Sequence, residues 1–220
     1  MTRLLIAGAT GLVGSLALQQ ALADERVSRV IALTRRPIAP HDKLENVVLD
    51  FADMPEDAAW WSVDGVVSAL GTTRAATSAP AAYRAIDYEY PLAVARHARA
   101  HGATRFALTS SLGADPRSFF TYTRTKGELE RDLQKLGFPS LTIVRPSVLD
   151  GPRAQPRRDE RMAAMLFGML APMLPRRWRI SPAGSVAAAL LEGAIAGPPG
   201  VHLVHNEDMR RSTESAGAAA

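Results

Sequence analysis

The sequence predicts an α/β protein built on a doubly wound parallel sheet, and two observations support this. Short apolar runs alternate with helical stretches along the first two thirds of the chain. The runs are almost continuously apolar, as expected of parallel strands that helices cover on both faces. A repeated order of strand, helix and strand is typical of a Rossmann-like sheet.

Six apolar runs are expected to form the strands of this sheet, at residues 3–9, 29–35, 46–51, 65–71, 105–111 and 140–146. Three stretches with helical spacing lie between them, at residues 12–25, 80–102 and 119–137. Two of these helices are expected to end near Gly102 and Gly137, because glycine readily stops a helix.

The length of 220 residues and the hydrophobic fraction of 47% fit one ordinary globular domain. We expect this domain to cover residues 1–212, followed by a frayed tail at residues 213–220. Elements from about residue 150 to 205 are expected to form a small C-terminal cap over the carboxyl edge of the sheet. They comprise an apolar helix at 162–170, a helix at 186–196 and a short strand at 201–205.

Composition excludes several classes of function. The chain has no cysteine, which rules out disulfides, thiol catalysis and thiolate metal sites and agrees with a reducing cytoplasm, where we expect the protein to reside. Glycines interrupt the apolar N-terminal stretch, so it is interpreted as a strand rather than an export signal. No run of about 18 apolar residues is available to span a bilayer.

The first functional motif is GATGLVG, which directly follows a predicted strand and opens a predicted helix. Its glycines, Gly8, Gly11 and Gly14, permit a tight turn, a close approach of the backbone to a pyrophosphate, and close packing of helix on strand. Thr10, Leu12 and Val13 complete the loop, and the helix N-terminus supplies amide donors. The motif therefore predicts a dinucleotide-binding loop, with a glycine-rich turn that binds nothing as the alternative.

The end of the second predicted strand reads Thr34, Arg35, Arg36. An NAD enzyme carries a carboxylate near this position to bind the ribose 2′-hydroxyl. Two guanidinium groups instead favour the 2′-phosphate of NADP, although NAD remains an alternative and both arginines could be solvated surface residues.

A second motif is the pair Tyr122 and Lys126. The chain has 23 Arg and 3 Lys, so a lysine here is unusual. Residues four apart lie on one face of a helix. The ammonium of Lys126 could therefore make the phenol of Tyr122 a usable proton donor or acceptor, and its compact head could also bind a cofactor ribose.

With these motifs the chain resembles the short-chain dehydrogenase/reductase superfamily. The similarity rests on GATGLVG, on LTSSLGAD at residues 108–115, on the YxxxK pair, and on TIVRPSVLDGPR at residues 142–153. It is greatest to small atypical members, a group that includes the Tat-interacting-protein oxidoreductases and proteins described as nucleoside-diphosphate-sugar epimerase-like. The resemblance covers roughly residues 3–205.

The resemblance implies roles for individual residues. Ser111 would bind a substrate carbonyl, Tyr122 would pass the proton, and Lys126 would hold the ribose; Ser110 competes with Ser111 for the first role. Further cofactor contacts would come from Asp50, Leu70, Gly71, Pro146, Ser147 and Val148. Many relatives carry an asparagine on the central helix for a proton relay, whereas this chain has Asp87.

Other polar clusters admit several interpretations. Residues 145–179 contain eight Arg and three acidic residues. Without interleaved aromatics this region favours a solvated face or the rim of a site for an anionic ligand over nucleic acid. Arg176, Arg177 and Arg179 could line such a rim or contact a second copy in a homodimer. His97 and His101 have the spacing of a metal pair, but no carboxylate ligand accompanies them, so no metal is expected.

Two functions follow from these expectations. In the first, the protein is an NADP-dependent oxidoreductase or epimerase-like enzyme that moves a hydride between nicotinamide and the carbonyl or secondary alcohol of a small molecule. In the second, it is a non-catalytic NADPH-binding regulatory or scaffold protein. The Ser, Tyr and Lys residues favour the enzyme.

Overall fold

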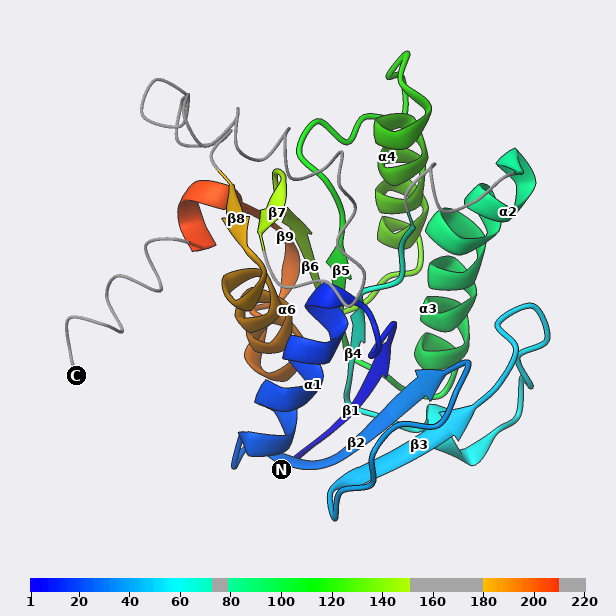
Figure 1. Ribbon diagram of the computed structural model, residues 1–220, viewed down its shortest axis with the longest axis vertical. Helices are drawn as coiled ribbons and strands as arrows, with labels where there is room; N and C mark the ends of the chain where they lie inside the picture. The colour runs from blue at the N-terminus through cyan, green and yellow to red at the C-terminus, as the bar shows by residue number, and fades with distance from the viewer. Residues whose placement is uncertain (73–78, 151–179, 210–220) are drawn as a thin grey trace.

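The computed structural model describes residues 1–72, 79–150 and 180–209, and these form a twisted parallel sheet with helices on both faces (Figure 1). The sheet has seven strands in the order β3-β2-β1-β4-β5-β6-β9, and every neighbouring pair is parallel. The strands are β1 (Thr2–Ala7), β2 (Val27–Thr34), β3 (Leu44–Val48), β4 (Gly65–Ser68), β5 (Arg105–Thr109), β6 (Ser140–Arg145) and β9 (Gly200–His205).

In the described ranges, α1 (Leu12–Ala23) and α6 (Ala183–Ala196) cover one face of the sheet, and α3 (Tyr90–Ala100) and α4 (Thr121–Gln134) cover the other. On the first face, α1 and α6 pack on a core that includes Leu4, Ile6 and Val67. On the other face, α3 and α4 pack on a core that includes Leu5 and Ile31. Because adjacent residues of the central strands point to opposite cores, the buried positions of these strands are mostly apolar, and the six predicted strands are confirmed.

The predicted central helix at residues 80–102 has three parts. It starts as α2 (Pro80–Arg84), passes through a π-helical turn at Ala85–Glu89, and continues as α3. A π turn inserts an extra residue into the helical repeat and often marks a functional site. Here the turn contains Asp87, whose side chain is fully buried.

The predicted cap needs a correction at its C-terminal part. The helix at 186–196 belongs to α6, which lies on the sheet face beside α1, and the strand at 201–205 belongs to β9, which extends the main sheet next to β6. Close packing explains this placement, because a Cβ at Gly65 of β4 would lie 2.1 Å from the carbonyl oxygen of Ala194 in α6. These elements therefore form the core rather than a lid.

Beyond the main sheet, β7 (Leu149–Asp150) and β8 (Ser181–Pro182) pair in parallel as a small second sheet. A short 3-10 turn at Ala59–Trp61 precedes β4. The apolar stretch 162–170, the arginines at 176, 177 and 179, and the tail at 213–220 lie outside the described residues. In the ranges that are described, no helix is long and apolar enough to cross a membrane.

The strand order reverses direction between β1 and β4, since β2 and β3 lie to one side and β5, β6 and β9 to the other. In open parallel sheets, ligands bind at such a switch point, outside the carboxyl ends of the strands. The predicted glycine motif follows β1 and so lies at this point.

Candidate active site

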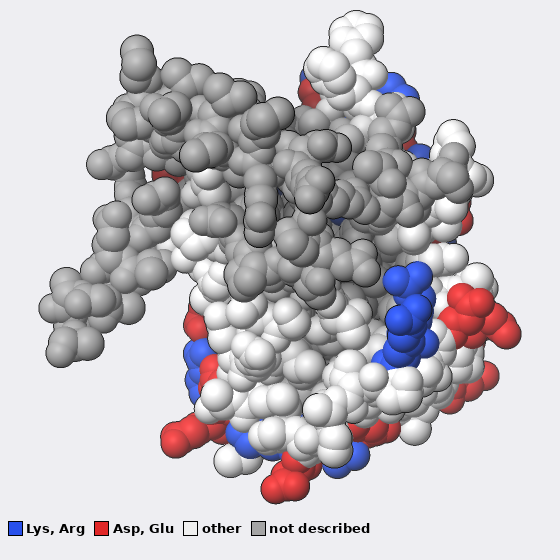
Figure 2. Space-filling model, viewed as in Figure 1, with Lys and Arg blue, Asp and Glu red and all other residues white. Residues whose placement is uncertain are grey.

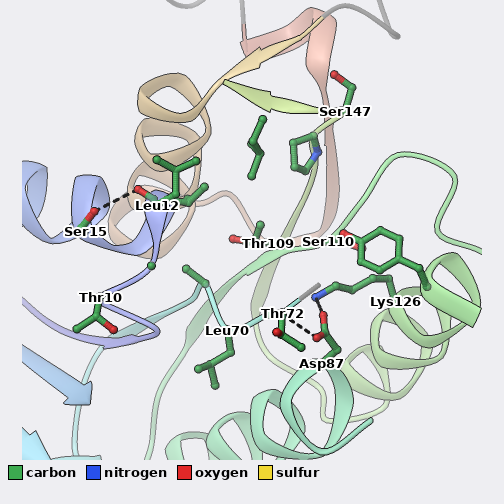
Figure 3. Close-up of a pocket in the computed structure, with 17 residues that line it drawn as sticks. Thr10, Leu12, Ser15, Leu70, Thr72, Asp87, Thr109, Ser110, Lys126 and Ser147 are labelled. Atoms are coloured by element: carbon green, nitrogen blue, oxygen red, sulfur yellow. Dashed lines mark hydrogen bonds and ion pairs between the residues drawn. The ribbon is translucent and has the colours of Figure 1, made fainter. Parts of the chain in front are cut away.

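A cavity of about 440 Å³ opens at the switch point. Its walls come from the segments that follow β1, β4, β5 and β6, together with one face of α4 (Figure 3). The lining residues are Thr10, Gly11, Leu12, Val13, Ser15, Ala69, Leu70, Gly71, Thr72, Asp87, Thr109, Ser110, Tyr122, Lys126, Pro146, Ser147 and Leu149. Both sequence motifs therefore meet in one cavity, although about 110 residues separate them.

The glycine loop has the geometry that its sequence predicts. Gly8 adopts φ +88°, a left-handed conformation that favours glycine, and a Cβ there would lie 2.7 Å from the backbone of Ala69. A Cβ at Gly14 would lie 2.0 Å from the carbonyl oxygen of Gly8. The start of α1 therefore packs directly on the loop, with the amides of its first turn beside the cavity.

A second cavity of about 270 Å³ shares Thr10, Gly11 and residues 69–72 with the first. Its far wall contains Phe51 and Tyr90, whose rings stack with centroids 5.9 Å apart. Arg35 also lines this cavity. An aromatic wall next to a cationic side chain can accommodate an aromatic base and a phosphate group.

Lys126 is held by an ion pair in the floor of the main cavity. Its Nζ lies 2.9 Å from Oδ1 of Asp87, and only 4% of its side chain is exposed. The other carboxylate oxygen of Asp87 accepts a hydrogen bond of 2.8 Å from the backbone amide of Thr72 (Figure 3). The acidic residue that departs from the family pattern is therefore the partner of the motif's lysine.

The floor leaves little space around this ion pair. A Cβ at Gly71 would lie 3.3 Å from Oδ1 of Asp87 and 3.5 Å from Nζ of Lys126. Glycine at this position therefore keeps the cavity open above the two charges.

Tyr122 stands at the mouth of the cavity, where 40% of it is exposed. It lies in the first turn of α4, one turn before Lys126, so both side chains approach the cavity from one face of the helix.

The two serines after β5 differ in their surroundings. Ser110 lines the cavity and is buried, and its hydroxyl donates to the carboxylate of Glu130, which Arg145 also binds. Ser111 is half-buried, does not line the cavity, and its hydroxyl donates to the adjacent carbonyl of Leu112 at 3.2 Å. Neither serine therefore meets both requirements of a substrate-binding hydroxyl, which are access to the cavity and a free donor.

Several of the predicted cofactor residues do not line either cavity: Gly14, Arg36, Asp50 and Val148. Gly14 acts through packing, as its close approach to Gly8 shows. Asp50 is exposed and its carboxylate accepts from the amide of Ala52 at 3.0 Å, so its position fits a turn residue better than an adenine contact. Val148 is 50% exposed.

The sequence prediction missed other cavity residues. Thr109 lines the main cavity, and its buried hydroxyl has no hydrogen-bond partner among the described residues. Phe51 and Tyr90 form the aromatic wall of the second cavity. Thr109 could have been found from its place before the serines at the end of a strand, whereas the stacking of Phe51 on Tyr90 joins segments about 40 residues apart and leaves no local pattern.

His97 on α3 contacts the core, and His101 follows the last residue of that helix. The ring of His97 stacks on Trp61 at 5.0 Å, and burial lowers the pKa of His97 below its usual value. No cluster of three metal-ligating side chains occurs in the parts of the chain that the structure describes. Figure 2 shows acidic and basic side chains intermingled along the lower rim of the visible face, and of the arginines at residues 145–179 only Arg145 is described.

Comparison with known families agrees with this geometry. Residues 8–164 match the family described as NAD(P)H-binding. The chain belongs to this family, and with its seven-stranded parallel sheet it is an atypical short-chain dehydrogenase/reductase.

Relatives extend over most of the chain. The protein named HTATIP2 of Rattus norvegicus is 33% identical over 211 residues, which cover 92% of this chain and 85% of the relative. The protein named fmp52, mitochondrial, of Emericella nidulans is 34% identical over 184 residues, which cover 77% of this chain and 76% of the relative. These two relatives agree with the resemblance to small atypical members of the superfamily.

Solved structures share the fold at low sequence identity. MoeE5 in complex with UDP-glucose and NAD superposes with a TM-score of 0.70 and 17% identity, covering 97% of this chain and 81% of the other. A UDP-glucose 4-epimerase from Thermotoga maritima with UDP-glucose has a TM-score of 0.66 and 14% identity, covering 92% and 76% of the two chains. At this identity the likeness concerns the fold.

The expectation of a cytoplasmic protein is contradicted. The fungal relatives of Emericella nidulans, Debaryomyces hansenii and Candida albicans are named mitochondrial. The expectation came from the absence of cysteine, which indicates that the fold needs no disulfide but does not identify a compartment.

Proposed function

We propose that this protein is an NADP-dependent oxidoreductase or epimerase-like enzyme that acts on the carbonyl or secondary alcohol of a small molecule. One observation carries the proposal: Tyr122 and the buried Lys126 face the same cavity as the glycine loop. This arrangement places a proton donor and a cation next to a dinucleotide site.

The residues present fit a bound dinucleotide. Residues 10–13 of the glycine loop line the cavity, and the loop is held there by the close packing at Gly8 and Gly14. Arg35 and the rings of Phe51 and Tyr90 line the adjoining cavity and suit a phosphorylated adenosine. The unpartnered hydroxyl of Thr109 supplies a further buried donor beside the main cavity.

When bound, the cofactor would supply or accept a hydride at its nicotinamide ring. The protein's own residues would bind the reactants and move the proton. Lys126 would bind the ribose hydroxyls with its compact ammonium, and Tyr122 would give a proton to the carbonyl oxygen during reduction or take one from the alcohol during oxidation. The hydrogen bond to the substrate oxygen would come from Ser111 or from Ser110. Ser111 does not line the cavity and its hydroxyl donates to Leu112, whereas Ser110 lines the cavity and its hydroxyl donates to Glu130, so either hydroxyl would have to exchange its partner for the substrate.

The substrate class is the least constrained part of the proposal. The structural neighbours MoeE5 and the Thermotoga maritima epimerase are each in complex with UDP-glucose, which supports a sugar nucleotide or another anionic compound as the substrate. The arginines at 176, 177 and 179 would bind such a substrate. Their replacement by glutamine should then weaken substrate binding and leave cofactor affinity unchanged.

A second candidate is a non-catalytic NADPH-binding regulatory protein. The ammonium of Lys126 is already paired with Asp87, and the hydroxyl of Ser110 with Glu130, so two of the polar groups at the site are engaged within the protein. Such a site would bind a dinucleotide and respond to its redox state without turning over a substrate.

One experiment separates the two functions. NADPH and NADH are titrated calorimetrically, and the parent is then assayed against carbonyl compounds, sugar nucleotides and quinones alongside Tyr122→Phe. The enzyme predicts turnover that Tyr122→Phe abolishes while NADPH affinity stays within about threefold, because only the phenolic proton is lost. Tight NADPH binding without turnover of any compound would support the regulatory protein instead, and a failure to bind either dinucleotide would exclude both.

A further inference from the structure

A buried cluster behind the cavity joins three elements of the fold. Glu130 lies on α4, and its carboxylate accepts hydrogen bonds from the hydroxyl of Ser110 and from the guanidinium of Arg145, whose Nε lies 3.0 Å away. Ser110 directly follows β5, and Arg145 is the last residue of β6. Glu130 is 3% exposed, so its charge is held inside the protein.

The cluster is positioned on the helical face that carries the site. Tyr122, Lys126 and Glu130 are spaced four residues apart, so they form one stripe along α4. The first two of these side chains line the cavity, whereas the third contacts the ends of the two strands.

The strand ends at this point are tied to each other as well. The amide of Ser110 donates to the carbonyl of Val144 at 2.8 Å, and the amide of Leu112 donates to the carbonyl of Pro146 at the same distance. The hydrogen bonds of Glu130 to Ser110 and Arg145 therefore also restrain the segments that carry Ser111 and Pro146.

Because α4 packs closely on the neighbouring loop, its position depends on the hydrogen bonds of Glu130 to Ser110 and Arg145. A Cβ at Gly127 would lie 2.3 Å from the backbone carbon of Asp115, so the helix lies directly on the loop that follows β5. The ion pair with Glu130 raises the pKa of Arg145 and keeps the guanidinium charged beside the carboxylate. A rigid connection of this kind transmits the position of the strand ends to the helix.

We propose that Glu130, held by Arg145, is a positioning residue that fixes Tyr122 and Lys126 of α4 relative to the strand ends carrying Ser111 and Pro146. The inference rests on the proposed function in assigning Lys126 to the cofactor ribose. The inference adds that the geometry of the site depends on Glu130, a residue that does not itself line the cavity.

The test uses two variants and one matched control. Glu130→Gln keeps the shape of the side chain and removes its charge. The double variant Glu130→Met with Arg145→Met removes both charges together, and because buried ion pairs can be replaced by apolar residues of similar size without loss of stability, it should remain folded. Glu128→Gln is the control, since Glu128 lies on the same helix and forms a more exposed pair with Arg84 at 2.7 Å.

Thermal unfolding and calorimetric NADPH binding are measured for each full-length protein. We expect Glu130→Gln and the double variant to bind NADPH about tenfold more weakly than the parent, and Glu128→Gln to bind within about twofold, because only the first two release α4 from the strand ends. For any substrate that the parent turns over, kcat should also fall in the first two variants.

The proposal is overturned if either variant stays folded and binds NADPH as tightly as the parent. It is also overturned if Glu130→Gln and the double variant both fail to fold, since the cluster would then serve stability alone. A parent that binds NADPH but turns over nothing contradicts the enzymatic function and leaves the binding measurement to decide the role of Glu130.

Discussion

The two sides of the cavity are built by different physical means. On the side of the glycine loop, residues 10–13 contribute no ionisable group, and the shape comes from backbone packing between Gly8 and Gly14. On the side of α4, the lining includes Asp87, Tyr122 and Lys126, and buried ion pairs hold the helix in place.

This difference indicates which changes each side tolerates. Close backbone packing resists any added atom but is indifferent to charge. A buried ion pair tolerates small changes of shape but not the loss of one partner, because the remaining charge has no water to solvate it. Substitutions can therefore distinguish the two sides by the kind of damage they cause.

The largest effect is expected from Lys126→Met. Asp87 is fully buried, and without the ammonium its carboxylate would retain, among the described residues, the amide of Thr72 as its hydrogen-bond donor. The free energy of unfolding should fall by about 3–5 kcal/mol in urea denaturation. Lys135→Met is the control, since Lys135 is 66% exposed in its pair with Asp132 and its loss should cost at most about 1 kcal/mol.

An equal loss of unfolding free energy in Lys126→Met and Lys135→Met would mean that the stability of the α4 side does not depend on a buried charge. Lys126→Arg refines the point, because it keeps the charge and enlarges the head group. Its NADPH affinity and turnover should fall, since a planar fork fits poorly where the ammonium is 4% exposed. Parent-like NADPH binding and turnover by Lys126→Arg would contradict the role given to the lysine.

The next effect concerns the glycine loop. Gly14→Ala adds a Cβ that would lie 2.0 Å from the carbonyl oxygen of Gly8, so the loop or helix must move. The free energy of unfolding should fall by about 1–3 kcal/mol, and NADPH affinity should fall with it. Gly184→Ala is the matched control, because a Cβ there meets nothing within 4 Å and alanine favours the helix. If Gly14→Ala unfolds and binds like this control, packing does not shape the loop.

A smaller effect tests the second cavity. NADPH should bind at least about tenfold more tightly than NADH, or about 1.4 kcal/mol, through the charge of the 2′-phosphate. Arg35→Gln should remove most of this preference, whereas Arg36→Gln should keep it, because Arg35 lines the cavity and Arg36 does not. Calorimetric titration of both cofactors measures the ratio, and equal affinities in the parent would eliminate the preference for NADP.

The smallest effect lies away from the cavity, at His97. Burial lowers the pKa of His97 below 6.5, so the unfolded chain takes up the proton first. The contribution to stability is present above about pH 6.5 and is lost as the pH falls through the folded-state pKa. Urea unfolding between pH 7.5 and 5 should show a weaker pH dependence of stability in His97→Phe than in the parent. An identical pH dependence in the two proteins would exclude His97 as its source.

The sequence by itself determined the sheet, the glycine loop and the pairing of Tyr122 with Lys126. Each of these is recorded in residues close together in the chain: continuous apolar runs, glycines three apart, and two side chains four apart on a helix. Local spacing is sufficient because the backbone geometry of a strand or helix fixes where such neighbours point.

Only the tertiary structure decided what these local features meet. It placed α6 and β9 in the core rather than in a cap, paired Lys126 with Asp87 from a π turn 39 residues earlier, and distinguished Arg35 from Arg36 and Ser110 from Ser111. These contacts depend on packing and charge between segments that are distant in the sequence. Such contacts produce no periodic pattern of residues from which they could be predicted. The physical reason is that burial selects the partner of a side chain after the elements have assembled, whereas spacing along the chain can fix only the face from which it starts.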